Sequence, residues 1–358
     1  MAIPFNEKEL EVVRVQHDYR GDTPIYSFPV KMREALLATM LDRKPIWQLT
    51  GIETRMFMPS IHPDNVARAL VIENKPFDAL TMGGGKDMFG IQWDYIPVAN
   101  GSMERPGTEL FDDVNEWQDK VVFPDVDSWD WEGSAEMNKD FFNDDQAFQA
   151  WFQTGWFERL ISFMGFEDAA VALMDEDQQD AVRELLDKVS DTYIDIIDHY
   201  VKYFPNVYSF YMHDDWGSQK ETFFNPDLVE ETIVPAMKKV TDHIHSLGRV
   251  AELHSCGQIM RQVPNMIKAG WDTWSGQPMN DSHALYEQYG DKIVLGVAAP
   301  EVDVSDPESK QRELAHEFVE KFCNPGKPCV MTFPMAKQMP NAFREEIYVR
   351  SRKKYAEI

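Results

Sequence analysis

The second half of the chain alternates short apolar runs with longer stretches in which apolar residues recur every three or four positions. Each apolar run ends at a polar segment, which leads into an amphipathic stretch. The apolar runs are residues 206–212, 249–253, 271–274, 292–299 and 328–333, and the amphipathic stretches after them are residues 226–248, 258–270, 280–290, 307–322 and 340–358. Pro235 predicts a break or kink in the first of these helices. Strand, polar loop and helix in this repeated order are typical of parallel βαβ units.

Polar and reactive residues collect directly after the predicted strands. In a (β/α)8 barrel these positions all face one mouth, where active sites are built. They would also share one edge of an open doubly wound sheet, so the pattern alone does not prove closure. The glycine-rich stretch GGGKDMFG at residues 83–90 lacks the Lys-Ser/Thr ending of a phosphate-binding loop and is interpreted as a turn. We therefore expect an α/β fold in the form of a single (β/α)8 TIM barrel.

The first half of the chain is less regular. Residues 31–45 predict a helix that leads into a first strand near residues 46–50. Residues 89–104 predict a β-excursion, a hairpin that flanks the mouth of the barrel. No change in composition marks a boundary, so we expect one domain over residues 1–358 with a helical and β elaboration over about residues 1–135.

Composition restricts the partners. The formal net charge of −26 repels phosphate backbones and anionic lipid surfaces, so we expect neither nucleic acid nor membrane as a partner. The negative charge also disfavours a substrate with many carboxylates, unless a local basic pocket outweighs the negative electrostatic potential of the protein. No apolar stretch is long enough to span a bilayer, and no signal peptide is evident. Three sparse cysteines indicate a reducing compartment, and we expect a cytoplasmic protein.

The candidate chemistry begins in the stretch AELHSCGQIM, residues 251–260. His254 and Cys256 are two positions apart at the end of a predicted strand, so they project to the same side, which Glu252 shares. An imidazole and a thiolate at this spacing can bind one zinc ion at distances of roughly 2.0 and 2.3 Å. The alternative is a hydrogen-bonded core histidine beside an inert thiol. The spacing alone leaves both readings open and favours the second.

Four longer motifs carry a family resemblance. They are HSCG with QVPNMIKAGWD, HDDWGSQ with FNPDLVEETIVPAMKKV, KDMFGIQWDYIP, and VVFPDVDSWDW. With these the chain resembles the uroporphyrinogen decarboxylase superfamily and is most similar to its branch of corrinoid-dependent methyltransferases. The resemblance implies a (β/α)8 barrel and a catalytic zinc ion held by a His-x-Cys pair, here His254 and Cys256. It also implies a third, distal ligand, usually a cysteine.

The distal ligand is where this chain departs from the family pattern. The expected Gly-Cys turn after the last strand reads TFPMAKQ, with Pro334 and Met335 in its place, and a thioether is a poor zinc ligand. Glu301 follows a predicted strand at the correct end, whereas Cys329 begins a strand. We rank Glu301 above Cys329 as the third metal ligand, and Glu252 is a candidate partner of the ligands rather than a ligand.

Substrate-binding candidates come from other predicted strand ends. The segment HDDWGSQ offers side chains that either orient a substrate or hydrogen-bond the ligand histidine; the alternative is a helix cap with a turn. An aromatic mouth would suit a flat, apolar substrate such as a methoxylated aromatic. The predicted substrate-binding residues are His213, Asp214, Asp215, Gln219, Trp93 and Gln277.

The resemblance implies an O-demethylase-type methyltransferase that moves a methyl group from a methoxylated aromatic to the cobalt of a corrinoid. The corrinoid would be carried by a separate protein, because the chain lacks an Asp-x-His-x-x-Gly cobalamin segment. Zinc would act as a Lewis acid on the ether oxygen. Two alternatives are a metal-free decarboxylase and a non-catalytic barrel that binds a small molecule. The first requires an N-terminal arginine pair, whereas residues 45–57 contain only Arg55. A homodimer is compatible with all three readings.

Overall fold

The computed structural model describes residues 3–18, 21–334 and 336–357, so Met335 lies outside the described residues. Internal contacts divide the chain into two compact units. Unit 1 comprises Met1–Arg55, Asp144–Ala147 and Asp272–Ile358, and unit 2 comprises Met56–Asn143 and Phe148–Trp271. The strand β3 (Thr54–Phe57) contains one of the sequence boundaries between them. A single-domain organisation therefore stays a prediction, and the two units are described separately.

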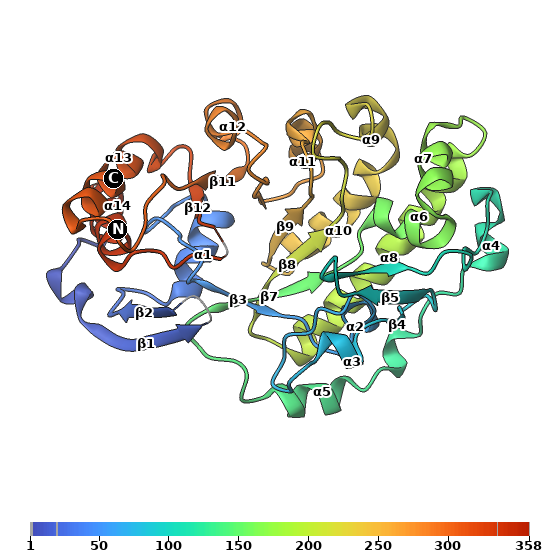
Figure 1. Ribbon diagram of the computed structural model, residues 1–358, viewed down its shortest axis with the longest axis horizontal. Helices are drawn as coiled ribbons and strands as arrows, with labels where there is room; N and C mark the ends of the chain where they lie inside the picture. Colours follow the sequence, from blue (N-terminus) through green and yellow to red (C-terminus); the bar gives the residue numbers. More distant parts are fainter. Residues whose placement is uncertain (1–2, 19–20, 335, 358) are drawn as a thin grey trace. The chain divides into compact units, whose positions relative to one another are not determined.

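Three parallel strands form the centre of unit 2. They are β7 (Ala147–Phe152), β8 (Val207–His213) and β9 (Val250–His254), paired in that order (Figure 1). Their register sets Tyr211 opposite Glu252 and His213 opposite His254. Because side chains alternate along a strand, both pairs project to the same face of the sheet.

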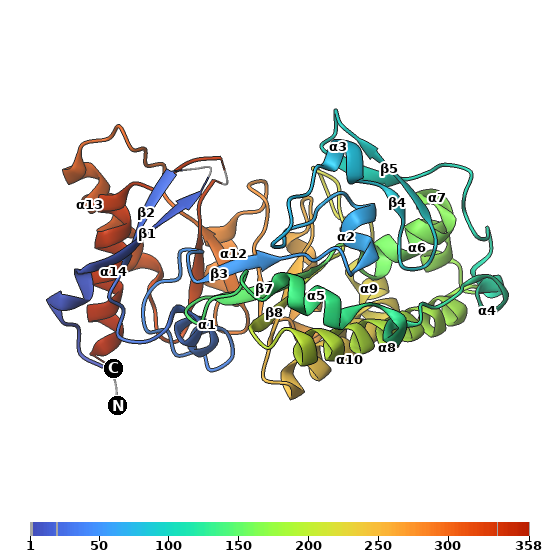
Figure 2. The same cartoon turned by 90° about the horizontal axis from the view of Figure 1, so that it is seen from below.

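Helices follow each of these strands, as the sequence predicts for β8 and β9. They are α6 (Trp156–Met164), α7 (Phe166–Met174), α8 (Gln179–Tyr203), α9 (Pro226–Thr232), α10 (Val234–Ser246), the 3-10 helix η4 (Met260–Gln262) and α11 (Val263–Lys268). The long helix α8 packs along α10, as Figure 2 shows. The predicted interruption at Pro235 is confirmed, because α9 ends at Thr232 and Pro235 lies in the first turn of α10.

The N-terminal part of unit 2 contains a small antiparallel sheet and several short helices. Its strands β4 (Gly85–Lys86), β5 (Gln92–Ile96) and β6 (Gly101–Glu104) pair in that order, which confirms the hairpin predicted over residues 89–104. The helices are α2 (Pro63–Ala67), α3 (Ala79–Met82), η2 (Val114–Glu116), α4 (Trp117–Lys120), η3 (Val126–Ser128) and α5 (Trp131–Asn138).

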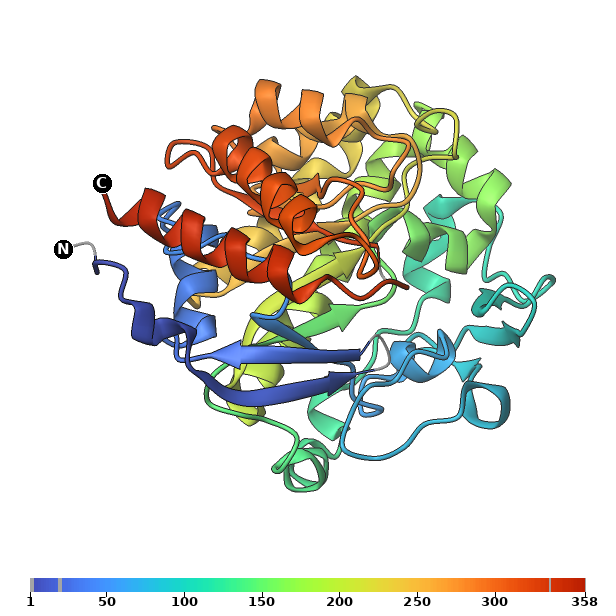
Figure 3. The same cartoon turned by 60° about the vertical axis from the view of Figure 1, so that its left-hand side comes forward.

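Unit 1 has its own parallel strands, β10 (Thr273–Trp274), β11 (Val294–Ala298) and β12 (Cys329–Thr332). Its other elements are η1 (Glu7–Leu10), β1 (Val12–Asp18), β2 (Gly21–Tyr26), α1 (Met32–Met40), α12 (Ser282–Tyr289), α13 (Glu308–Phe322) and α14 (Asn341–Ala356). Figure 3 shows the β1–β2 ribbon beside α14, where the rings of Tyr26 and Tyr348 are 6.0 Å apart. The strand predicted near residues 46–50 is reduced to one parallel bridge between Leu49 and Val330.

The alternation of parallel strands and helices confirms a mixed α/β fold. Closure into an eight-stranded barrel stays a prediction. No helix among the described residues is both long enough and apolar enough to cross a bilayer.

Candidate metal centre

Four side chains with metal-binding atoms meet beyond the ends of β8 and β9 in unit 2. They are His213, Asp215, His254 and Cys256, and one ligand atom from each lies within 4.8 Å of all the others. His254 Nε2 lies 3.2 Å from Cys256 Sγ, and His213 Nε2 lies 3.7 Å from an Asp215 carboxylate oxygen. Ligand atoms around a tetrahedral zinc ion are separated by roughly 3.3–3.8 Å, given bond lengths of about 2.0–2.3 Å. Two nitrogens, one sulfur and one oxygen are donors that zinc accepts, so this set fits a zinc ion.

The parallel register explains why these side chains converge. His213 and His254 are direct partners across the strand pair, and their rings stack with centroids 4.9 Å apart. Asp215 and Cys256 each follow two positions later, and the Cys256 backbone N–H donates to the Asp215 carboxylate at 2.6 Å. The His213–Asp215 pair at the end of β8 therefore lies beside the His254–Cys256 pair at the end of β9, with the same spacing in both.

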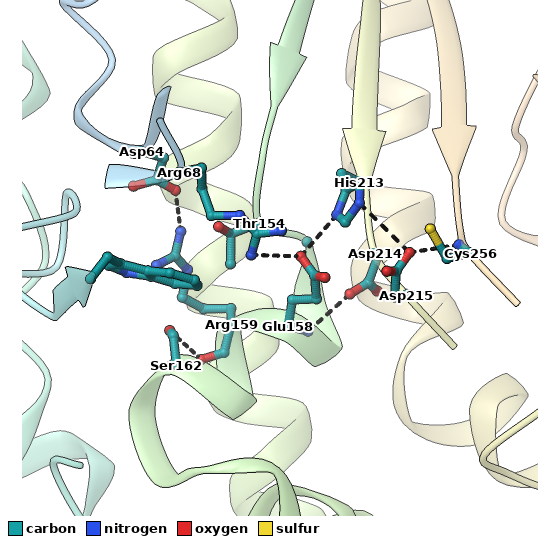
Figure 4. Close-up of polar contacts among 12 residues, drawn as sticks. Asp64, Arg68, Thr154, Glu158, Arg159, Ser162, His213, Asp214, Asp215 and Cys256 are labelled. Atoms are coloured by element: carbon teal, nitrogen blue, oxygen red, sulfur yellow. Dashed lines mark hydrogen bonds and ion pairs between the residues drawn. The ribbon is translucent and has the colours of Figure 1, made fainter. Parts of the chain in front are cut away.

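Each histidine is oriented through its other ring nitrogen. The Nδ1 atom of His213 lies 2.9 Å from the Glu158 carboxylate, and the Nδ1 atom of His254 lies 3.1 Å from the Tyr211 hydroxyl (Figure 4 shows the first contact). These contacts leave both Nε2 atoms facing the cluster. Hydrogen bonds of this kind fix the ring orientation of a ligand histidine and make it a better base.

Glu158 is held in place through helix α6. Its neighbour Arg159 is fully buried and forms ion pairs with Asp64 and Asp87, so α6 is fixed to the preceding segments of unit 2. Glu158 itself also pairs with Arg68, at 3.4 Å. Burial raises the pKa of Glu158, but the charges of Arg68 and His213 outweigh this and lower it below its usual value. Glu158 is therefore an anion at neutral pH.

The two histidines differ in protonation. Burial, followed by the charge of His213, lowers the pKa of His254 to about 4, so His254 is neutral at pH 7 and has a free lone pair. Burial also opposes a charge on His213, but Glu158, hydrogen bonds to Cys256 and Glu158, and Asp215 raise the pKa of His213 to about 10. Burial raises the pKa of the Cys256 thiol. A bound cation would release these protons from His213 and Cys256, as ligand sites do on metal binding.

Asp214 points away from this cluster and has a different partner set. It is fully buried and accepts hydrogen bonds from the backbone N–H of Glu158 at 3.0 Å and the indole N–H of Trp216 at 2.9 Å. Burial raises its pKa to about 7, although these hydrogen bonds oppose the shift. Asp214 thus satisfies a free N–H in the first turn of α6, and it fits the alternative of a helix cap better than a substrate contact.

A cavity of about 310 Å³ opens onto His213 and His254 within unit 2. The β5–β6 hairpin forms one wall, as expected for an excursion that flanks the site. Trp151 forms another, stacked on Tyr211 with ring centroids 4.2 Å apart. The residues that line the cavity are Arg68, Ala69, Leu70, Ala79, Tyr95, Asn100, Gly101, Ser102, Trp151, Gln153, His213 and His254. Its volume is at the lower end of the range for small-molecule sites, roughly 300–1,000 Å³.

Three further residues that were predicted to bind substrate, Trp93, Gln219 and Gln277, do not line this cavity. Trp93 is buried behind its wall, where the indole N–H donates to Asp87 at 3.1 Å and the Arg68 guanidinium stacks 4.9 Å from its ring. Gln219 is exposed on the loop after β8. Gln277 belongs to unit 1, in the segment between β10 and α12.

The two candidates for the third ligand, Glu301 and Cys329, both belong to unit 1. Glu301 is exposed just after β11. Cys329 is buried in an apolar cluster, and its thiol lies 3.6 Å from the Gln48 side-chain oxygen. Burial raises its pKa well above the usual value for a thiol, so it is a poor source of thiolate. Glu301 and Cys329 stay predictions as the third ligand, and among the described residues His213 and Asp215 are the metal-binding side chains that lie beside His254 and Cys256.

Part of the chain is similar to a known family, and the fold is similar to that of a solved structure. Residues 160–331 match the uroporphyrinogen decarboxylase (URO-D) family. The fold is similar to that of a methyltransferase from Methanosarcina mazei, with a TM-score of 0.54 at 12% sequence identity over 92% of this chain and 98% of that one. A mannanase from Thermotoga petrophila aligns with a TM-score of 0.30 at 10% identity over 70% of this chain and 68% of that one. No curated protein matches the chain. Residues 160–331 are thus similar to the uroporphyrinogen decarboxylase family, and the methyltransferase from Methanosarcina mazei shares the fold.

Proposed function

We propose that this protein is a zinc-dependent methyltransferase that moves a methyl group from a methylated small molecule to the cobalt of a corrinoid. The observation that carries this proposal is the meeting of a histidine–aspartate pair and a histidine–cysteine pair, whose two histidines line a cavity that Tyr95 and Trp151 also line. In this proposal His213, Asp215, His254 and Cys256 hold the zinc ion. When bound, zinc supplies Lewis acidity toward the atom that carries the methyl group.

The residues of the chain bind and orient the reactants. Glu158 and Tyr211 keep the two ligand histidines in one orientation, which spares reorganisation when the methyl donor arrives. Trp151 and Tyr95 offer flat faces along which an aromatic ring can pack. We therefore keep a methoxylated aromatic as the methyl donor, as the sequence predicts.

Several further parts of the proposal follow from the family. The corrinoid would belong to a separate protein, which must approach the cavity so that cobalt reaches the methyl carbon. The fold would be a single closed (β/α)8 barrel over residues 1–358. A cytoplasmic location is supported by the three cysteines, which are all free thiols.

The decarboxylase alternative finds less support. A tetrapyrrole with many carboxylates requires a large cavity with several cationic groups. Among its described lining residues, this cavity of about 310 Å³ has Arg68 as its one arginine and has no lysine. The cavity is too small and has too few cationic groups for a macrocycle of that kind.

The direct test is methyl transfer. Purified protein with measured zinc content would be mixed with a reduced corrinoid protein and a panel of methoxylated aromatics, and methylation of cobalt would be followed by its absorbance spectrum. We expect transfer that falls in proportion to zinc content when the metal is removed with a chelator. Full activity in zinc-free protein, or no transfer from any donor of the panel, would contradict the proposal.

A further inference from the structure

The cavity differs in charge from the rest of the protein. The chain carries 61 acidic and 35 basic residues, yet the residues that line the cavity include no aspartate or glutamate among those described. They do include one arginine, Arg68, directly after α2. A cavity lined by one arginine and by no carboxylate is a place where a strongly acidic protein can accept a ligand with a single negative charge.

The Arg68 guanidinium is held in place by its neighbours, but most of its N–H donors have no acceptor among the described residues. Its guanidinium stacks on the buried Trp93, with 4.9 Å from its central carbon to the ring centroid. Among the described residues its guanidinium makes one ion pair, at 3.4 Å to Glu158, and no side-chain hydrogen bond. A guanidinium has five N–H donors in a fixed fork, so most of them remain available to a ligand. Figure 4 shows Arg68, Glu158 and His213 in a row that leads to Asp215 and Cys256.

A second polar group lies on the facing hairpin. Ser102, on β6, lines the cavity, and its hydroxyl is buried with no hydrogen-bond partner in the described part of the chain. Buried hydroxyls are normally hydrogen-bonded, so this hydroxyl beside an open cavity is available to bind a ligand atom. Its register partner on β5 is Tyr95, which presents an aromatic ring to the same cavity.

We propose that Arg68 and Ser102 form an anion subsite, and that the small molecule bound in this cavity carries one anionic group in addition to its methylated group. This inference deepens the proposed function and rests on it in one respect, namely that the cavity holds the methyl donor. A fixed guanidinium fork matches the paired oxygens of a carboxylate, and it also accepts a phosphate. Three probes of one size separate these chemistries: 4-methoxybenzoate, 4-methoxyphenyl phosphate and the neutral 4-methoxybenzamide.

The test measures binding rather than turnover. Isothermal titration calorimetry on the zinc-containing protein should show that at least one of the two anions binds at least tenfold more tightly than the amide. R68Q should remove that preference, and R68K should restore part of it, because lysine keeps the charge but not the fork. S102A should weaken the preferred anion by about three- to tenfold. The tighter of the two anions identifies the subsite as one for carboxylate or for phosphate.

A matched control removes the same charge outside the cavity. Arg105 lies just after the same hairpin, exposed and paired with Asp94 at 2.6 Å, so R105Q should leave the preference intact. Zinc content and circular dichroism of each variant would show whether Arg68 acts only by holding Glu158. Equal binding of the amide and both anions, binding of none of the probes, or an unchanged preference in R68Q would overturn the anion subsite. An anion preference that depends on Arg68 without methyl transfer would instead contradict the proposed function alone.

Discussion

The Glu158 carboxylate lies 2.9 Å from Nδ1 of His213, and this contact directs the opposite nitrogen of the ring toward Asp215 and Cys256. Glu158 belongs to helix α6, which follows β7, whereas His213 ends β8. The orientation of one ligand histidine thus depends on a side chain from the preceding strand–helix pair. That dependence gives the first prediction.

Replacing Glu158 with glutamine should weaken zinc binding without removing any ligand. The amide keeps the size of the side chain but loses the negative charge that favours the correct ring orientation, and such outer partners typically change metal affinity by about 10- to 100-fold. Competition with a chelator would measure the affinity. E167Q, on the exposed face of α7, is the matched control and should bind zinc as the wild type does. Equal affinity in E158Q and E167Q would count against this role.

The ligand set predicts opposite outcomes for two cysteines. C256S should lose most of the zinc and keep the fold, because a serine hydroxyl seldom ionises and Cys256 lies beyond the end of β9. C329A should keep the zinc and lose about 1 kcal/mol of stability, because Cys329 is buried in the apolar cluster of unit 1. Elemental analysis and urea unfolding would measure both effects. Loss of zinc from C329A would return that thiol to the ligand set.

Two of the four side chains in the candidate cluster, His254 and Cys256, were proposed as metal ligands from the sequence alone. The His254–Cys256 pair is visible as a spacing within one strand end, whereas the contribution of His213 and Asp215 depends on the register between two strands. The motif HDDWG places His213 and Asp215 at the same spacing as His254 and Cys256. This spacing is the sequence signal that could have identified the second pair. Glu158 and Arg68 had no local signature, because they reach the site through contacts between distant segments.

In the fold, too, the features set by local sequence were predictable, and those set by contacts between distant segments were not. Parallel strands with helices between them follow from periodicity, and Pro235 marked the interruption between α9 and α10. The strand predicted at residues 46–50 was wrong in extent, because its apolar residues pack as a loop that makes one bridge at Leu49. Whether the strands close into a barrel depends on pairing between strands far apart in the sequence, which local periodicity does not encode.

A buried histidine remote from the proposed ligands predicts how stability depends on pH. His62 is fully buried against Trp129, Phe152 and Tyr200, and neither ring nitrogen has a hydrogen-bond partner among the described residues. Burial lowers its pKa from 6.5 to about 4. Between these values the unfolded chain binds more protons than the folded one. The contribution of His62 to the free energy of unfolding is therefore complete above pH 6.5 and falls by roughly 3 kcal/mol as the pH drops to about 4.

H62F should remove this dependence, because phenylalanine fills the same aromatic site and does not titrate. The free energy of unfolding of H62F, relative to wild type, should rise by roughly 3 kcal/mol between about pH 7 and about pH 4. Urea unfolding at several pH values would measure it. V171I, at an exposed position in α7, changes no titratable group and should show a constant difference over the same range. A constant difference in H62F as well would contradict the assignment.

We expect that adding one methyl group at Gly155 weakens zinc binding at the proposed metal centre, although Gly155 is not a proposed ligand. Gly155 precedes α6, and a Cβ atom there would lie 2.4 Å from the Asp214 Cβ and 2.7 Å from the His213 carbonyl oxygen. Real Cβ atoms essentially never come so close to other heavy atoms, so in G155A the segment after β8 must shift. We expect a loss of about 1–3 kcal/mol in stability.

Because His213 and Asp215 flank Asp214, the same shift should displace two of the four proposed ligands and reduce zinc affinity by at least about tenfold. The control is G326A, where the nearest atom to the added Cβ is the Asn324 side-chain oxygen at 3.6 Å, an ordinary contact. Chelator competition and urea unfolding of both variants would test this. A G155A protein that unfolds more easily but binds zinc as tightly as G326A would show that the loop after β8 does not position the ligands, and that the metal is held by other residues.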